Sequence, residues 1–433
     1  MHLKLRIFKD NKLGAAAFYF SGNLINSALP LMLLPILTRY LTPSDYGIVA
    51  MFGVVISFYG AFIGMNTGAA VLVRQFQLDP QRQAQFVGAC LWILLISTSV
   101  FFVIILFVHG QIEEVTQLPQ NWVFIAIFIS VTQYVIGVRL TLYQAKYEAK
   151  KFVLLQFSQS LLNLVLSMYF IIGIHMDWEG RLLAQTITGA ILLLLSLTTL
   201  YQSKEVTISL FSLPKNDMHD ALKFGVPLIP HMVGSIIFAT TDKLMIGYFL
   251  DISQVGLYTV MAQIGSIIGL ISVSFHSVYS PWLMSKLGSR NKQDDCLIVR
   301  ITYLYFFIML ALAALISILS PWFSLFVGKN FAIDQHVFFL ILTAGVFTSM
   351  YFMFNNYIFF SNRTSYLSLM TIGCGIFNLG ASYFLIKANG LIGAAQATAL
   401  TQLAFFLLAW FLSHKLHPMP WMKALLPKQW EKN

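Results

Sequence analysis

Twelve stretches of this chain contain no Asp, Glu, Lys or Arg, and each is long enough to cross a membrane as a helix. They are residues 13–38, 46–73, 83–112, 115–138, 152–176, 182–203, 224–241, 252–285, 301–328, 335–362, 364–386 and 388–414. A helix rises about 1.5 Å per residue, so a bilayer core needs about 20 mainly apolar residues. Because lipid offers the backbone no hydrogen-bond partners, the spans are predicted to be helices. The predicted fold class is therefore an all-α integral membrane protein with about 12 transmembrane helices.

The composition agrees with this fold class. Charged residues make up 10% of the chain and hydrophobic residues 58%, whereas soluble domains carry about 25% charged residues. No run shows the alternating pattern of a transmembrane β-barrel. The first stretch is too long for a cleaved signal peptide, carries Asn23 and Asn26, and lacks a small-residue cleavage site. We therefore expect the first span to be retained.

The net charge of +10 is distributed unevenly over the predicted loops. An even number of spans puts both termini on one side, and 21 of the 27 Lys and Arg residues fall on that side. Four fall on the other side: Arg39, Arg181, Lys329 and Lys387. By the positive-inside rule both termini are predicted to be cytoplasmic. The basic surplus is thus a topology signal and a source of lipid headgroup contacts, and no nucleic acid is expected as a partner.

The spans divide six and six about the longest predicted connection, which is cytoplasmic and contains Ser, Lys, Asp and Pro. The halves share a loose pattern at an offset of 209 residues: residues 40–47 resemble 249–256, and Gly60 aligns with Gly269. The predicted organisation is an N-terminal six-helix lobe (1–201), a cytoplasmic linker (202–222), a C-terminal six-helix lobe (223–414) and a cytoplasmic tail (415–433).

Two bundles of six spans have the same orientation in the membrane, and the predicted fold places them around a central cleft. Rocking of two such bundles opens a cleft to each side of the membrane in turn. The first span of each lobe carries two prolines, which remove helix hydrogen bonds and bend the helix: Pro30 and Pro35, then Pro227 and Pro230. Two interpretations stay open, since the bends either serve the motion or only shape the packing.

The chain carries none of the common motifs of catalytic or nucleotide-binding sites. It contains no P-loop, no HExxH, no paired CxxC and no Gly-x-Gly-x-x-Gly after a strand. We therefore predict no catalytic residues, no metal ligands, no cofactor and no ATP hydrolysis by this chain.

Basic side chains outnumber acidic ones near and within the spans. The candidate substrate-binding residues are Arg39, Arg74, Arg139, Lys243, Asp242, His231, His276 and Asn66. An ionisable group in lipid is costly and usually faces a cavity, and a cleft lined by these cations would favour an anion. For Arg74 and Arg139 the open alternative is interfacial anchoring. For Asp242 and Lys243 it is a structural ion pair or snorkelling, and for Asn66 and the two histidines it is a satisfied packing contact.

Three groups of residues together resemble a known family. They are Leu37-Thr38-Arg39-Tyr40-Leu41 with Tyr46-Gly47; Asp242-Lys243-Leu244-Met245-Ile246-Gly247 followed by Val255-Gly256-Leu257-Tyr258; and Asn378 with Gly390, Gly393-Ala394-Ala395 and Ala397-Thr398. Each group is loose, and the three are specific only in combination. They resemble the polysaccharide biosynthesis or O-antigen flippase family of the multidrug/oligosaccharidyl-lipid/polysaccharide (MOP) exporter superfamily, over the whole chain.

This resemblance implies a multi-pass bacterial inner-membrane protein that flips an undecaprenyl-diphosphate-linked oligosaccharide, such as an O-antigen unit for lipopolysaccharide, to the periplasmic leaflet. It implies the glycolipid, membrane lipids and other glycan-assembly membrane proteins as partners, without ATP hydrolysis. Within the motifs it carries over only Lys243 and, less directly, Arg39 as contacts of the anionic substrate. Arg74 and Arg139 are predicted from charge and position alone.

Two other functions stay open as alternatives. A membrane-embedded glycan polymerase or ligase usually has its catalytic site on a sizeable outer loop, and the predicted outer loops near 110–120 and 322–334 are short. A multidrug/cation antiporter of the same superfamily commonly has an acidic residue in its first helix, and residues 13–38 contain none. The flippase is therefore the predicted function.

The charge asymmetry generates a prediction about topology. Reporter fusions at Lys9, Lys215 and Lys428 should report the cytoplasm, and a fusion at Glu114 should report the periplasm, because the positive-inside rule orients the spans. Alkaline phosphatase and fluorescent-protein fusions measure this directly. A periplasmic signal at Lys215 would contradict the division into six and six spans.

Overall fold

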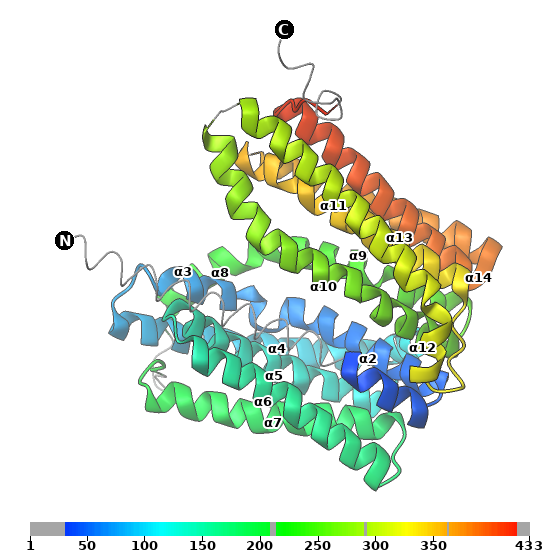
Figure 1. Ribbon diagram of the computed structural model, residues 1–433. Coiled ribbons are helices and arrows are strands. Elements are labelled where there is room, and N and C mark those ends of the chain that lie inside the picture. Colours follow the sequence, from blue (N-terminus) through cyan, green and yellow to red (C-terminus); the bar gives the residue numbers. More distant parts are fainter. Residues whose placement is uncertain (1–30, 208–213, 290–291, 362, 422–433) are drawn as a thin grey trace. The chain divides into compact units, whose positions relative to one another are not determined.

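The computed structural model describes residues 31–207, 214–289, 292–361 and 363–421, and every regular element in these ranges is a helix (Figure 1). Ten helices of the described ranges are long and apolar enough to cross a membrane. The predicted all-α membrane fold class is therefore confirmed. Most of the first predicted span, residues 13–38, lies outside the described ranges, so the count of twelve spans stays a prediction.

The helices follow one another with short connections. In chain order they are a short apolar helix that includes Leu31–Tyr40, α2 (Pro43–Phe62), η1 (Ile63–Asn66), α3 (Gly68–Arg74), α4 (Pro80–Thr116), α5 (Gln120–Ala145), α6 (Ala149–Met168), η2 (Tyr169–Gly173), α7 (Trp178–Gln202), α8 (Lys215–Gly225), η3 (Val226–Leu228), α9 (Ile229–Phe249), α10 (Ile252–Ser289), α11 (Lys292–Ile318), α12 (Ser320–Phe326), α13 (Gln335–Phe360) and α14 (Thr364–Leu416).

Acidic residues at the ends of the spans cap the membrane helices. Asp45 and Thr42 form a capping box at the start of α2, with the Thr42 N–H donating to Asp45 Oδ2 at 2.8 Å. Asp79 and Asp334 each accept two backbone N–H groups in the first turns of α4 and α13. Such caps satisfy backbone donors that the helix itself leaves free. The scarce acids thus help to set where the apolar helices begin.

The chain divides into two compact units, Met1–Thr240 and Thr241–Asn433. In the first unit α5 packs against α2, α4 and α7, and Trp122 of α5 contacts the rings of Phe52 and Trp178 edge-on. In the second unit α13 packs against α10 and α14. The predicted lobe boundaries and the central cleft stay predictions.

The longest helix, α14, turns back on itself. Gly390 has a left-handed φ of 58° with ψ of −134°, which glycine adopts without strain. Gly393 then lies against the backbone carbonyl of Leu385, although eight residues of straight helix would separate them by about 12 Å. The predicted spans 364–386 and 388–414 are therefore the two legs of this hairpin.

The predicted second span, 46–73, is not one continuous helix. Gly64 and Met65 have φ values of 75° and 49°, and these residues separate α2 from α3. The Gly64 N–H donates to Ser97 Oγ of α4 at 2.9 Å, and Thr67 Oγ1 lies 2.6 Å from the Tyr134 hydroxyl of α5. Backbone groups freed within a membrane must find partners in the protein, and these side chains supply them.

The helix break also receives the end of α8. A side-chain carbon at Gly225 would collide with the Met65 carbonyl oxygen, and Asn66 C and Thr67 N would lie 3.2 Å from it. Only glycine allows this backbone-to-backbone approach. Pro227 and Pro230 follow in η3 and α9, so the seventh predicted span contains a short 3-10 turn at its prolines while its backbone stays helical.

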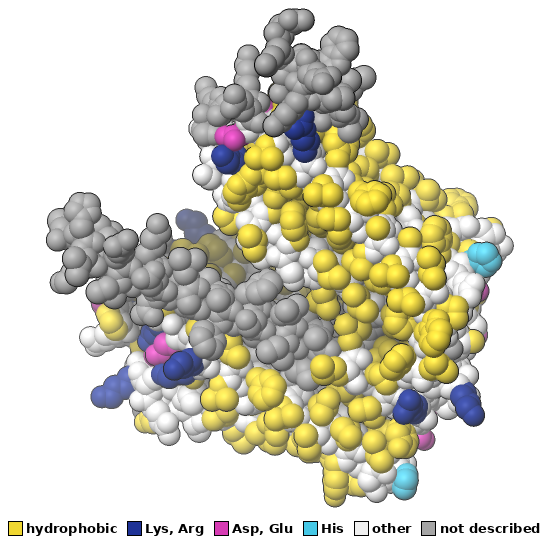
Figure 2. All heavy atoms as spheres, viewed as in Figure 1, with side chains coloured by type: hydrophobic (Ala, Val, Ile, Leu, Met, Phe, Trp, Pro, Cys, Tyr) yellow, Lys and Arg dark blue, Asp and Glu magenta, His cyan; other side chains and the backbone are white. Residues whose placement is uncertain are grey.

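The outer surface of the described helices is apolar, as a lipid-facing surface requires. Figure 2 shows hydrophobic side chains over most of the visible described surface, with few charged groups among them. Large side chains such as Phe107, Phe384 and Tyr201 are 80%, 71% and 78% exposed. In water these would be an aggregation hazard, and in a bilayer they contact hydrocarbon. The protein is therefore a multi-pass membrane protein.

The contact at Gly225 predicts a sharp difference between two glycines. Gly225→Ala should destabilise the protein by about 1–3 kcal/mol, because an added methyl group meets backbone that cannot rotate away. Gly137→Ala in α5 is the control, since nothing lies within 4 Å of its added carbon. Thermal unfolding of the purified variants in detergent measures both. Equal midpoints for the two variants would contradict the contact.

Candidate functional site

Two ion pairs of the first unit join α8 to the helices beside it. Arg74, at the end of α3, donates from Nε and Nη2 to the two carboxylate oxygens of Asp220 at 2.7 and 2.6 Å. Arg82 of α4 lies 3.6 Å from Asp217. The bidentate geometry at Asp220 is the stronger kind of charge-assisted contact. These pairs hold α8 where its last residue meets the break in the second span.

Arg139 lies inside the first unit and is only 3% exposed. Its Nη1 donates to Glu205, which also accepts from Lys146, and its guanidinium lies 4.0 Å from the ring centroid of Tyr143. Burying a cation without a counter-charge is costly, and Glu205 supplies that charge. The contact therefore ties the segment after α7 to α5.

The carboxyl of Glu205 lies outside the membrane-spanning helices. Burial disfavours its charged form, but hydrogen bonds from Lys146 and Ser203 and the charge and hydrogen bond of Arg139 outweigh this and lower its pKa below the usual value. The ionised carboxylate is thus the form that the folded protein stabilises.

These pairings bear on two of the predicted substrate contacts. The predicted spans themselves contain no acid that could pair with Arg74 or Arg139. Their partners Glu205 and Asp220 lie in the predicted linker, 66 and 146 residues away in sequence. Direct contact of either arginine with a substrate stays a prediction, and the structure favours a role in holding the fold. The chain has few acids, so the presence of Glu205 and Asp220 in the predicted linker was the sequence feature that could have indicated this structural role.

Asn66 lies in the helix break, half-buried, with a left-handed φ of 54°. Its backbone contacts Gly225 of α8. Asparagine adopts this conformation more readily than other non-glycine residues. The residue is thus placed at an irregular backbone segment within the membrane, a feature that often accompanies transport sites.

Asp242 and Lys243 lie half-buried on α9. Asp242 Oδ1 accepts from the backbone N–H of Lys243 at 2.8 Å, and the Tyr258 hydroxyl also hydrogen-bonds to Asp242. The Tyr258 hydroxyl in turn lies 3.4 Å from Thr398 Oγ1 of α14. Among the described residues no carboxylate lies within ion-pair distance of the Lys243 ammonium. The hydrogen bonds of Asp242 thus come from a backbone N–H and a tyrosine hydroxyl, and its carboxyl is the neighbouring acid of Lys243 without forming a direct ion pair with it.

The other candidates fall into different surroundings. Arg39 is exposed at the end of the Leu31–Tyr40 helix, and His231 is exposed on α9. His276 of α10 is half-buried, with Nε2 3.1 Å from Asn356 Nδ2 of α13, and Ser280 donates to the same amide. His276 thus makes the packing contact that was the alternative to substrate binding. Within the described ranges, Asp242 and Lys243 are the only candidates joined to each other by a hydrogen bond.

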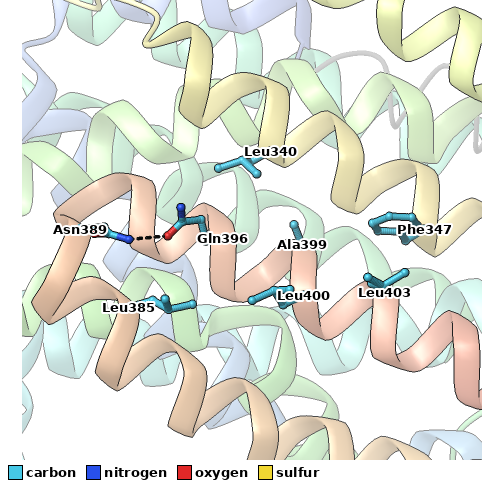
Figure 3. Close-up of a pocket in the computed structure, with 8 residues that line it drawn as sticks. All are labelled: Leu340, Phe347, Leu385, Asn389, Gln396, Ala399, Leu400 and Leu403. Atoms are coloured by element: carbon cyan, nitrogen blue, oxygen red, sulfur yellow. Dashed lines mark hydrogen bonds between the residues drawn. The ribbon is translucent and has the colours of Figure 1, made fainter.

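A pocket of about 420 Å³ lies between α13 and the two legs of α14 (Figure 3). Its lining residues are Leu340, Phe347, Leu385, Asn389, Gln396, Ala399, Leu400 and Leu403. The two amides hydrogen-bond to each other at 2.7 Å at one end of the pocket, and the rest of the lining is hydrocarbon. None of the described lining residues is charged, so the pocket suits an apolar chain and not a diphosphate.

Residues 14–287 match the model of a family described as "Polysaccharide biosynthesis protein". A relative from Haemophilus influenzae, named "Uncharacterized membrane protein", is 24% identical over 373 residues, covering 84% of this chain and 88% of the relative. The family match spans more than half of the chain and confirms the resemblance seen in the motifs.

Two solved structures have the same fold. An inward-facing multidrug resistance MATE family transporter of the MOP superfamily superimposes with a TM-score of 0.73 at 17% identity, over 90% of this chain and 95% of that one. The lipid II flippase MurJ, in an inward closed conformation, gives a TM-score of 0.69 at 14% identity, over 92% and 86%. At this identity the likeness concerns the fold alone.

Glu205 generates a prediction about pH. Its folded pKa is depressed, so its stabilising effect is complete above the unfolded pKa of about 4.3 and is lost as pH falls through the folded pKa. At pH 7 Glu205→Gln should therefore lower the free energy of unfolding by up to roughly 3–5 kcal/mol and lower the unfolding midpoint. Between pH 5 and pH 3 the midpoint of the variant should fall less than that of the unchanged protein, because the variant has no carboxylate to protonate. Thermal unfolding across this range measures the effect.

Glu148→Gln is the matched control. Glu148 pairs with Lys151 three residues away at 3.1 Å and is more exposed than Glu205, so its removal should cost about 0–1 kcal/mol. If both variants lost the same stability and had the same pH profile, the buried pair of Glu205 with Arg139 would contribute no more to stability than an exposed ion pair.

Proposed function

The chain belongs to the polysaccharide biosynthesis protein family, and on that premise we propose that it is a flippase for an undecaprenyl-diphosphate-linked oligosaccharide. The cargo is an O-antigen unit or a related surface glycan unit, moved from the cytoplasmic to the periplasmic leaflet. The family match over residues 14–287 is the observation that carries the proposal. The fold, which solved transporters share, supports it.

The diphosphate of such a substrate needs a cation at membrane depth. Lys243 supports the proposal because it lies on a membrane helix, is half-buried, and has no carboxylate within ion-pair distance among the described residues. An ammonium in that state gains most from an anionic ligand. Arg39, exposed at the end of the first described helix, is the second candidate contact. We assign Arg74 and Arg139 to the fold, since each already has its carboxylate.

The energetics of the proposed movement need no ATP. An inside-negative membrane potential favours outward movement of an anion by about 2.3 kcal/mol per charge per 100 mV. Rocking of two helix bundles would expose the headgroup site to each side in turn, while the prenyl chain stays in lipid. We place the protein in the bacterial inner membrane with both termini cytoplasmic, beside other proteins of glycan assembly, and give it no catalytic role.

Transport in liposomes tests this function. The purified protein should move a fluorescent diphosphate-linked glycolipid between leaflets without ATP, and Lys243→Ala should slow the movement about tenfold to a hundredfold. A charge-assisted contact contributes roughly 1.5–3 kcal/mol, which gives that factor if headgroup capture limits the rate. Lys243→Arg should keep part of the activity, because its charge survives although its geometry differs. Accessibility of the label to an external quencher measures the rate.

Asp242→Ala is the matched control for the lysine. It should lower the amount of folded protein more than Lys243→Ala does, because Asp242 already accepts two hydrogen bonds inside its unit. Joining of glycan units by the purified protein would favour a polymerase or ligase. Efflux of a cationic drug without glycolipid movement would favour an antiporter, and either result would replace the proposal.

A further inference from the structure

Another cation of the membrane helices, in the first unit, forms no ion pair with any described residue. Arg181 lies in the first turn of α7, three residues after Trp178, and is half-buried. Its Nη1 donates to Asn163 and, at 2.6 Å, to Ser167 Oγ, both on α6. The Tyr46 ring of α2 lies near the guanidinium. In sequence, Arg181 is one of the four cations on the predicted outer side.

Every partner of the Arg181 guanidinium in the described ranges is neutral. The neighbouring acids Asp177 and Glu179 are exposed, and neither forms an ion pair with it. The only acids of the chain outside the described ranges are Asp10 and Glu431, and both lie near the predicted cytoplasmic termini. In contrast, Arg74 and Arg139 each contact a carboxylate.

The geometry leaves one edge of this guanidinium unused. Among the described residues only Nη1 has hydrogen-bond partners, and Nε is buried without one. A guanidinium presents its Nε and one Nη as a planar fork that matches two oxygens of a phosphate or carboxylate. The N-terminal end of α7 adds its own positive partial charge at the same place. The unpaired guanidinium edge and the helix N-terminus therefore both favour binding of an anion at this position.

We propose that Arg181, with Asn163 and Ser167, forms a binding site for a phosphate group in the outer half of the first unit. Asn163 and Ser167 hold Nη1, which fixes the plane of the guanidinium and leaves its Nε–Nη2 edge without a partner among the described residues. Such a phosphate has two possible sources, the headgroup of a membrane lipid or a free diphosphate. The site is independent of Lys243 and does not depend on the proposed flippase activity.

Thermal unfolding of delipidated protein in dodecyl maltoside tests the site in separate arms. One arm adds inorganic pyrophosphate, a second adds phosphatidylglycerol, and a third adds diacylglycerol, which has the chains but no phosphate. A ligand that binds only the folded state raises the midpoint in a concentration-dependent way. Stabilisation by pyrophosphate would identify a free anion as the ligand. Stabilisation by phosphatidylglycerol alone, and not by diacylglycerol, would identify a lipid headgroup.

Variants assign the effect to Arg181. Arg181→Gln should shift half-saturation about tenfold to a hundredfold, because a charge-assisted fork is lost. Arg181→Lys should retain part of the binding, and it remains a test if the Gln variant does not fold. Lys329→Gln, an exposed cation of the predicted outer side, should respond as the unchanged protein does. No stabilisation by either phosphate compound, or equal stabilisation of Arg181→Gln, would overturn the proposal.

Discussion

The structure depends on one constraint, which is that polar backbone groups in a membrane must find their partners inside the protein. Helices meet it along most of the described chain, and the break between α2 and α3 is an exception. There Ser97 accepts the N–H of Gly64, and Thr67 bonds both the Gly64 carbonyl oxygen and the Tyr134 hydroxyl. Gly225 lies directly on the same backbone, so the break is also where the end of α8 packs closely against the second span.

The same low-dielectric surroundings sort the cations of the spans into two kinds. Arg74 and Arg139 have carboxylate partners that tie distant parts of the first unit together. In the described ranges the hydrogen-bond partners of Arg181 are neutral, and Lys243 has a neighbouring acid, Asp242, but no carboxylate within ion-pair distance of its ammonium. A paired charge stabilises the fold, whereas a charge without an ion-pair partner is available to bind a ligand of opposite sign. This distinction, and not the number of basic residues, points to the two phosphate sites proposed.

Sequence patterns predicted the architecture well, because span length and the absence of charge are local properties. The hairpin legs of α14 follow the two predicted spans, and the caps at Asp79 and Asp334 lie just before the spans they begin. The motifs around Arg39, Asp242 and Asn378 led to the correct family. The continuous second span was wrong, since Gly64 in an apolar helix does not by itself indicate a break.

The amino-acid sequence by itself determined that the chain lies in a membrane, that its fold is helical and to which family it belongs, because each follows from composition and short-range spacing. Only the tertiary structure decided which charges are matched. Glu205 and Asp220 lie far from Arg139 and Arg74 in the chain and meet them only when α7 and α8 pack against their neighbours. Whether a cation is a fold contact or a ligand contact depends on the distance to its nearest carboxylate, and that distance is set by packing.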